Sequence, residues 1–344
     1  MANKSIQIIV IFLLMHLQLF AGTGVFQFLD LPVSSRMAAL GGKNISLMDD
    51  DINFALLNPA LLSPNSHNMI GLNMANYLAD VTFGTAAYSR TYDSHHLAVG
   101  VQFVDYGKFK EVTEHNEILG EFSAKDVAIS LIYNRKIIDN LYVGGTFKPI
   151  FSAYERYFSF GAAIDLGMSY QHPNKLFQTG LVLRNMGTQF KGYYADVDGQ
   201  HYEPLPFDMQ VGLSYKLRHA PFRLSATMYN LHNWNLSYID NRHAIQSYDR
   251  EELAIKIPFV DNFFRHMIIG VEFLPSKNFY VAASYNHRRH QELKMQGFKS
   301  MTGFSFGAGV KVKYFQIGFG MSQFQTGNSA YMFSLSTSLN DFRH

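Results

Sequence analysis

Three groups of residues in this 344-residue chain have the types and spacing that could support chemistry. Asp49-Asp50-Asp51 offers carboxylates to Ca²⁺, but three consecutive acids cannot all point at one ion, so a helix cap or a turn is favoured. His287 and His290 flank two arginines whose charge would repel a metal, which favours a solvated loop rim. Glu272 and Lys311 are charges on small-residue strand faces, where they form either a paired charge or a ring that guides a substrate.

Other kinds of chemistry find no support in the sequence. The chain has no cysteine, which excludes disulfides, thiolate metal sites and cysteine nucleophiles. The segment Gly307-Ala308-Gly309 lacks the helix start and the later glycine of a phosphate loop, and no nucleophile elbow or zinc motif is present. A net charge of +2 gives no field for attracting nucleic acid. We therefore expect a protein that is not an enzyme and that holds no metal or cofactor.

A further set of residues suits contacts with another protein, because tyrosine and tryptophan bury much area and keep a polar tip. This set comprises Phe190, Tyr193, Tyr194 and Tyr202 in the segment 188–206, and Trp234 and Tyr238 in the segment 234–265. The alternative is that these aromatic side chains fold back over the body of the protein. If they bind a partner, replacing Tyr193 and Tyr194 by alanine should release it without unfolding the protein.

The elements that must position these residues are β-strands with one apolar face. In 315–323, Phe315, Ile317 and Phe319 alternate with glutamine, glycine and serine. Charged residues are only 16% of the chain, against roughly 25% in soluble proteins, and aromatic residues are 15%. A soluble β-sandwich would carry charges on its second face, whereas small polar residues suit the interior of a transmembrane barrel. We therefore predict an all-β, antiparallel, up-and-down transmembrane barrel.

The pattern predicts about fourteen strands within residues 69–340, with a consistent alternation of connections. Short connections follow the even-numbered strands, and the long segments 106–120, 188–206, 234–265 and 290–300 follow odd-numbered ones. Outer-membrane barrels have short periplasmic turns and long external loops, so both ends are expected in the periplasm. The predicted strands are 69–78, 81–91, 96–105, 121–135, 141–154, 157–171, 176–187, 207–217, 222–233, 266–275, 279–289, 301–312, 314–323 and 330–340.

Two segments precede the predicted barrel. Residues 1–22 combine Lys4, an apolar run and a small residue at the end, which predicts a signal peptide, export by the general secretory route and a place in the outer membrane. Residues 23–68 fit the strand period poorly and are rich in small residues and turn formers. Because a barrel of this size leaves a wide lumen, we expect 23–68 to be a plug inside it; a loose periplasmic tail is the alternative.

At this point several stretches resemble a known family. They are VFQFLDLPVSSRMAALGGKNISLMDDDINFALLNPALLSPNSHNMIGLNMANYLADVTFG near the N-terminus, GLVLRNMGTQFKGYY at 180–194, LPFDMQVGLSYKL at 205–217, APFRLS at 220–225 and FRHMIIGVEFLPSKNFYVAASYN at 264–286. They resemble the PorQ family of type IX secretion proteins of Bacteroidota, which is grouped with PorV among FadL-like barrels with an N-terminal plug. Asn58-Pro59-Ala60 matches the NPA turn of that group.

The resemblance implies a function at the cell surface. It implies a non-enzymatic barrel that anchors the surface protein PorZ and, through it, the PorU and PorV attachment complex in the outer membrane. The alternative that the barrel and plug allow by themselves is a FadL-like transporter of a hydrophobic small molecule. A greasy pocket in the lumen would favour transport. A barrel enzyme such as a lipase would need a nucleophile and a base, for which the sequence offers no assembled pair.

Overall fold

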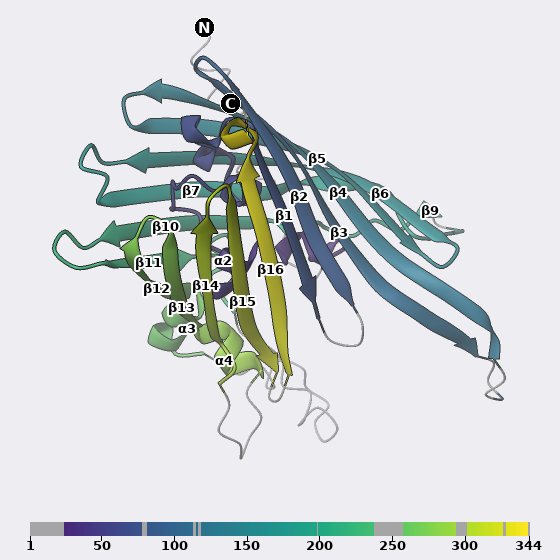
Figure 1. Ribbon diagram of the computed structural model, residues 1–344. Coiled ribbons are helices and arrows are strands. Elements are labelled where there is room, and N and C mark those ends of the chain that lie inside the picture. The colour runs from purple at the N-terminus through teal and green to yellow at the C-terminus, as the bar shows by residue number, and fades with distance from the viewer. Residues whose placement is uncertain are drawn as a thin grey trace, which may run out of the picture.

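The structure is a computed structural model that describes residues 24–77, 81–112, 115, 118–197, 199–236, 257–293, 301–325 and 328–342. Fourteen antiparallel strands close into one barrel (Figure 1), in which each strand pairs with its neighbour along the chain and the last strand pairs with the first. This confirms the predicted fold class and strand number. The predicted signal peptide, 1–22, lies outside the described residues and stays a prediction.

The barrel strands match the predicted ones closely, and β5 and β6 match at both ends. They are β1 (Met69–Asn76), β2 (Thr82–Tyr92), β3 (His95–Val112), β4 (Ile118–Ile138), β5 (Leu141–Tyr154), β6 (Tyr157–Gln171), β7 (Phe177–Lys191), β10 (Asp208–Lys216), β11 (Phe222–Met228), β12 (Met267–Ser276), β13 (Phe279–Asn286), β14 (Phe304–Val312), β15 (Phe315–Gln325) and β16 (Asn328–Ser338).

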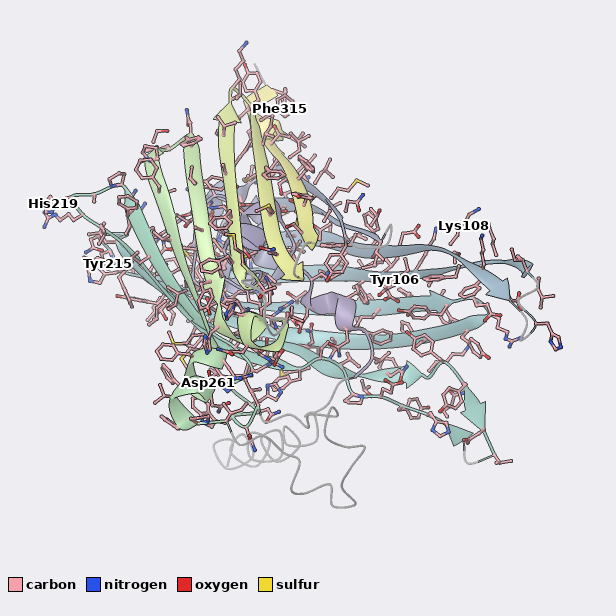
Figure 2. The ribbon with its side chains drawn as sticks, turned by 90° about the horizontal axis from the view of Figure 1, so that it is seen from below. Tyr106, Lys108, Tyr215, His219, Asp261 and Phe315 are labelled. Carbon is pink, nitrogen blue, oxygen red and sulfur yellow. The ribbon has the colours of Figure 1, made fainter. Side chains whose placement is uncertain are left out.

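The apolar side chains of these strands point outward, as predicted. Phe315, Ile317 and Phe319 are exposed on the outer face of β15, whereas Gly318 and Gly320 face the interior against Ser35. Figure 2 shows Tyr215 and Phe315 among the side chains on the outside of the sheet. A continuous apolar exterior around a small-residue interior is the arrangement of a barrel surrounded by lipid. Among the described residues, no helix is both long and apolar enough to cross a membrane.

The two ends of the barrel differ. We call the end with the short connections, such as Asp139–Asn140 between β4 and β5, the turn side, and the opposite end the loop side. The turns on this side include Asp93, Asn140 and Lys175 at positive φ, which tight hairpins require. The strand series begins and ends on the turn side, where Met69 pairs with Ser338. The plug, by contrast, starts on the loop side, because the Val25 amide donates to the carbonyl of Pro204, just before β10.

The wall formed by β3 to β7 is taller than the rest, which corrects two predicted loops. Residues 106–120 were expected to form a long loop, but β3 and β4 have 18 and 21 residues and pair as a hairpin past Asp105 and Lys125. Figure 1 shows these strands running beyond the ends of β1 and β2. The segment 188–206 likewise begins as β7 and then forms the small hairpin of β8 (Ala195–Asp196) and β9 (Gly199–Gln200).

Two short helices lie on the loop side beside the lower wall. They are α3 (Phe259–Arg265), which precedes β12, and α4 (His287–Leu293), which follows β13. The strand predicted for 279–289 therefore ends at Asn286, and the one predicted for 222–233 ends at Met228. His287 and His290 lie in α4 rather than forming a metal pair. His287 Nε2 contacts Asp261 Oδ1 at 2.7 Å instead.

The plug, residues 24–68, lies inside the barrel. Its elements are η2 (Gln27–Asp30), α2 (Ser35–Ala39), η3 (Ile52–Leu56), η4 (Pro59–Leu61) and η5 (Pro64–Ser66), and a further short helix, η7 (Leu339–Phe342), follows β16. Two apolar layers hold it in place. Val25 to Leu29 pack with Phe83 and Leu205 toward the loop side, and Ile45 to Leu62 pack with Ala98 and Ile132 toward the turn side.

Candidate functional site

The Asn58-Pro59-Ala60 turn is fully buried and fastens the plug to the tall wall. The Asn58 side chain accepts a hydrogen bond from the Ala60 amide and donates one to the carbonyl of Ile45, both at 3.0 Å. Asn134 on β4 donates to the carbonyl of Pro59 at 2.9 Å. Proline at the first position suits η4, because its missing N–H would have had no partner there. The turn is thus a structural clamp rather than a binding site.

Wall glycines make room for this clamp. A Cβ atom at Gly144 on β5 would lie 2.8 Å from the Pro59 carbonyl carbon, and one at Gly167 on β6 would overlap the Asn58 side chain. A Cβ at Gly180 on β7 would overlap the carbonyl of Ile45. Such approaches are closer than packed atoms tolerate, so these strand positions accept only glycine while the plug is seated.

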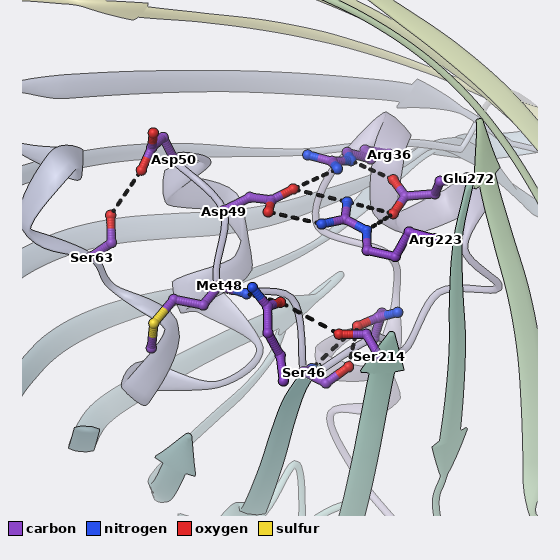
Figure 3. A network of polar contacts seen from close by, with 11 residues as sticks. Arg36, Ser46, Met48, Asp49, Asp50, Ser63, Ser214, Arg223 and Glu272 are labelled. Atoms are coloured by element: carbon purple, nitrogen blue, oxygen red, sulfur yellow. Dashed lines mark hydrogen bonds and ion pairs between the residues drawn. The ribbon is translucent and has the colours of Figure 1, made fainter. Parts of the chain in front are cut away.

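A network of four charges, of which only Asp49 is partly exposed, joins the plug to the wall near the turn side (Figure 3). Arg36 and Asp49 come from the plug, and Arg223 on β11 and Glu272 on β12 come from the wall. Arg36 contacts Glu272 at 2.9 Å and Asp49 at 2.6 Å, and Arg223 contacts Asp49 at 2.9 Å. Arg223 Nε also donates to Glu272 at 2.7 Å, so each charge has two opposite partners, which is what burial of ionic groups requires.

This network answers two expectations about the sequence. Glu272 lies on the interior face, as its alternation predicts, and it is a paired charge rather than part of a guiding ring. The three aspartates point to different partners: Asp49 to the arginines, Asp50 to the Ser63 hydroxyl, and Asp51 to the Asn53 amide at the start of η3. Asp51 is therefore a helix cap. The sequence analysis missed Arg36 and Arg223, although the alternation of β11 places Arg223 inward.

The charges also fix the protonation of Asp49. Burial alone would raise the pKa of Asp49, but the guanidinium groups of Arg223 and Arg36 outweigh burial and hold it well below its ordinary value. Asp49 is therefore ionised at neutral pH, and the plug is held by full charges.

A second ionic contact lies toward the loop side. Lys43 Nζ contacts Asp208 at 2.7 Å and Asp30 at 3.2 Å, and it lies 5.0 Å from the ring centre of Tyr229. Arg184 on β7 donates to the carbonyl of Leu29 at 3.0 Å. Ionic contacts thus pin the plug to the same side of the barrel at two levels.

Two cavities lie at opposite ends of the plug, and charged side chains contribute to the lining of both. The turn-side cavity has a volume of about 1210 Å³ and is lined by Asp49 to Asp51 and by Lys175, Lys216, Lys277 and Lys311. The loop-side cavity has a volume of about 520 Å³ and lies between the plug, α4 and the segment that follows β11. Pockets for hydrophobic ligands are lined mainly by apolar and aromatic side chains. Polar surface predominates in the turn-side cavity, whereas the loop-side cavity mixes apolar side chains such as Phe207 and Leu236 with charged ones.

The residues predicted to bind a partner have different surroundings. Tyr194 and Tyr202 are 55% and 58% exposed, and Tyr194 stacks on His201. Tyr193 is half-buried, and its hydroxyl lies 2.6 Å from Ser152 Oγ. Phe190 is exposed on β7 and packs against Phe160 on β6.

The two predicted residues of the segment 234–265 also differ. Trp234 is 39% exposed and stacks on His266 with ring centres 4.7 Å apart. Tyr238 lies outside the described residues. The structure therefore brings Tyr194 and Tyr202 together near the β8–β9 hairpin and places Trp234 apart from them, against α3.

A cluster that the sequence analysis missed lies inside the tall wall. Asp126 on β4 is buried and accepts hydrogen bonds from the hydroxyls of Tyr106 at 2.7 Å and Tyr154 at 3.0 Å, and also from Ser152. Tyr193 packs on Tyr154 with ring centres 5.3 Å apart. These contacts tie the start of the β7–β10 connection to the wall, which is why Tyr193 turns inward.

Comparisons with known proteins match the fold. No family model and no curated protein matches the chain. Among solved structures, a mutant of the monoaromatic hydrocarbon channel TodX matches with a TM-score of 0.56 at 11% identity, covering 90% of this chain and 99% of that one. The monoaromatic hydrocarbon channel CymD matches with a TM-score of 0.56 at 14% identity, covering 90% and 98%. The Pseudomonas putida toluene transporter TodX matches with a TM-score of 0.55 at 11% identity, covering 89% and 97%.

Proposed function

We propose that this protein is a non-enzymatic outer-membrane barrel, sealed by its own N-terminal segment, that anchors a partner protein at the cell surface. The observation that carries the proposal is the seating of the plug. Two apolar layers and two sets of ionic contacts hold the plug inside the barrel, and Asn58 to Ala60 bind to the wall. A barrel held shut in this way offers its loop-side surface, rather than its lumen, for function.

The loop side has features that suit docking. The wall of β3 to β7 projects beyond the rest, and Tyr194, Tyr202 and Trp234 are exposed near the loop-side ends of the strands. The resemblance to the PorQ family supplies the proposed partner, a PorZ-like surface protein that connects to PorU and PorV in the type IX secretion attachment complex.

A second candidate is a channel for a hydrophobic small molecule, and the comparisons favour it over anchoring. The matched structures include channels for monoaromatic hydrocarbons, and they share the fold over nearly the whole chain. At 11–14% identity this likeness concerns the fold. The charged side chains in the two cavities weigh the other way, because a hydrocarbon beside Lys43 or Asp49 would remove water from a charge without replacing its hydrogen bonds.

One experiment separates the two functions. The barrel, tagged in a surface loop, is isolated from membranes in mild detergent, and its bound proteins and lipids are identified by mass spectrometry. A stoichiometric exported surface protein supports anchoring. A barrel that arrives alone but carries a hydrophobic small molecule supports transport and contradicts anchoring.

Variants then locate the partner's contact. We expect Tyr194→Ala combined with Tyr202→Ala to release the partner while the barrel remains folded, because both rings are exposed. Tyr193→Phe is the matched control, because Tyr193 faces Ser152 and not the surface. Full retention of the partner by the double variant would rule out this placement of the interface.

A further inference from the structure

The loop-side cavity has the size and the walls of a ligand site. Its volume of about 520 Å³ falls in the range typical of small-molecule pockets. The plug turn Gly41-Gly42-Lys43 forms one wall, α4 forms a second, and the segment from Tyr229 to Leu236 forms a third. Asn262 of α3 fixes this last segment by accepting from the Leu236 amide and donating to the Trp234 carbonyl. The segment Tyr229 to Leu236, which borders the cavity, is thus held against α3.

Hydrogen-bond donors dominate the polar lining. Lys43 is already paired with Asp208 and Asp30, so the charges that remain are those of Arg288 and Arg289, against the carboxylate of Glu292. Arg289 is anchored by its contact with the Gly41 carbonyl at 3.5 Å. The side chains of Asn230 and Asn233 add amide groups to the same walls. A ligand that meets mostly donors must itself bring acceptors.

Arg288 is the residue best placed to bind such a ligand. Its Nε donates to Glu292 Oε1 at 2.7 Å, and within the described part of the chain its two terminal amino groups make no hydrogen bond. Those two groups form the planar fork that matches a phosphate or a carboxylate. Nearby, His232 Nδ1 is buried without a hydrogen-bond partner among the described residues. A bound oxyanion would supply acceptors for both side chains.

We propose that the loop-side cavity binds a phosphate group, either inorganic phosphate or the headgroup of a phosphorylated lipid, with Arg288 as its principal ligand. This site is independent of whether the surface also anchors a protein. Glu292 competes with the ligand, because its carboxylate forms an ion pair with Arg288 when no anion is bound in the cavity. The same pair therefore yields two variants with opposite expected effects.

The test is calorimetric titration of the full mature chain, purified in a phosphate-free nonionic detergent. Sodium phosphate is titrated against sodium chloride of equal ionic strength. We expect Arg288→Gln to weaken phosphate binding by about tenfold or more, because the bidentate contact is lost. We expect Glu292→Gln to tighten binding by about threefold, because Arg288 is released from its exposed ion pair. Lys277→Gln, which lines the opposite cavity, is the matched control and should bind as the wild type does.

Short-chain lipids distinguish the two sources of phosphate. Monomeric dihexanoyl phosphatidic acid that binds much more tightly than inorganic phosphate assigns the site to a lipid headgroup, and equal or weaker binding assigns it to the free ion. Absence of binding of both probes to the wild type and to Glu292→Gln overturns the proposal. An equal loss of binding in Arg288→Gln and Lys277→Gln also overturns it, because that result reflects only the net charge of the protein.

Discussion

Asn58 shows how much a single side chain can contribute to a sealed lumen. It is fully buried, its oxygen caps η4, and its nitrogen holds the carbonyl of Ile45. Two of its neighbours on the wall, Gly167 and Gly180, are glycines and offer no side chain to replace these bonds. The tripeptide was singled out from the sequence by resemblance, and its role as a clamp follows from these contacts.

We predict that Asn58→Ala lowers the free energy of unfolding by about 2 to 4 kcal/mol, because it leaves two buried backbone groups without partners. Asn65→Ala, an exposed asparagine in the same segment, is the control and should have little effect. Guanidinium unfolding of the refolded protein in detergent measures both. Equal effects of the two variants would show that the clamp contributes nothing specific.

The charge on Asp49 predicts a dependence of stability on pH. Because the folded protein lowers the pKa of Asp49 below its ordinary value of 3.8, the stabilisation is complete above that value and is lost as the pH falls below it. Between about pH 5 and about pH 2, the wild type should therefore lose more stability than Asp49→Asn. Asp50→Asn should follow the wild-type curve, because Asp50 accepts a hydrogen bond from the neutral Ser63 hydroxyl. Parallel curves for wild type and Asp49→Asn would contradict the role of this network.

At the scale of elements, two adjacent glycines on β5 differ in what they face: one lies against the plug and the other does not. Gly144 faces Pro59, whereas the nearest atoms to a Cβ at Gly145 are 3.7 Å away and belong to neighbouring β6. We predict that Gly144→Val unseats the plug and gives measurable conductance in planar bilayers, while Gly145→Val stays closed. Both variants should still form a folded barrel, which is seen as a difference in electrophoretic mobility between unheated and heated samples. A closed Gly144→Val barrel would show that the plug can shift without opening a path.

The strands could be predicted from the sequence where lipid dictates alternation, as in β5 and β6. The prediction failed beyond Asp105 on β3 and before Glu121 on β4, where Lys108 pairs with Glu121 and Phe109 stacks on Phe122. Where a hairpin extends beyond the lipid, its residues need not alternate between apolar and polar. Its sequence therefore resembles that of a loop. The Arg36 network was out of reach for another reason: it joins residues far apart in the chain, and one sequence does not reveal which charges meet.

At the scale of the whole molecule, the barrel and its projecting wall are separable. For the described residues from Lys108 to Phe122, the strand pairing is between β3 and β4. We predict that replacing 108–122 by a short turn leaves the heat-modifiable folded barrel intact and its lumen closed, while retention of a surface partner falls. Loss of the folded band after this deletion would show that the wall helps the barrel to close.

The path of the plug sets an order of events during biogenesis. Its described start, Gly24, lies by Pro204 on the loop side, and its end joins β1 on the turn side. This segment therefore passes through the barrel from one end to the other. The barrel closes only when β16, the last of its strands to be synthesised, pairs with β1. If the strands close around the plug, no part of the chain has to pass through a finished barrel. If the barrel closes first, the N-terminal segment has to be inserted through it. We therefore expect the barrel to close around the plug during insertion. A defect in the plug should then appear first as a failure of β1 to pair with β16.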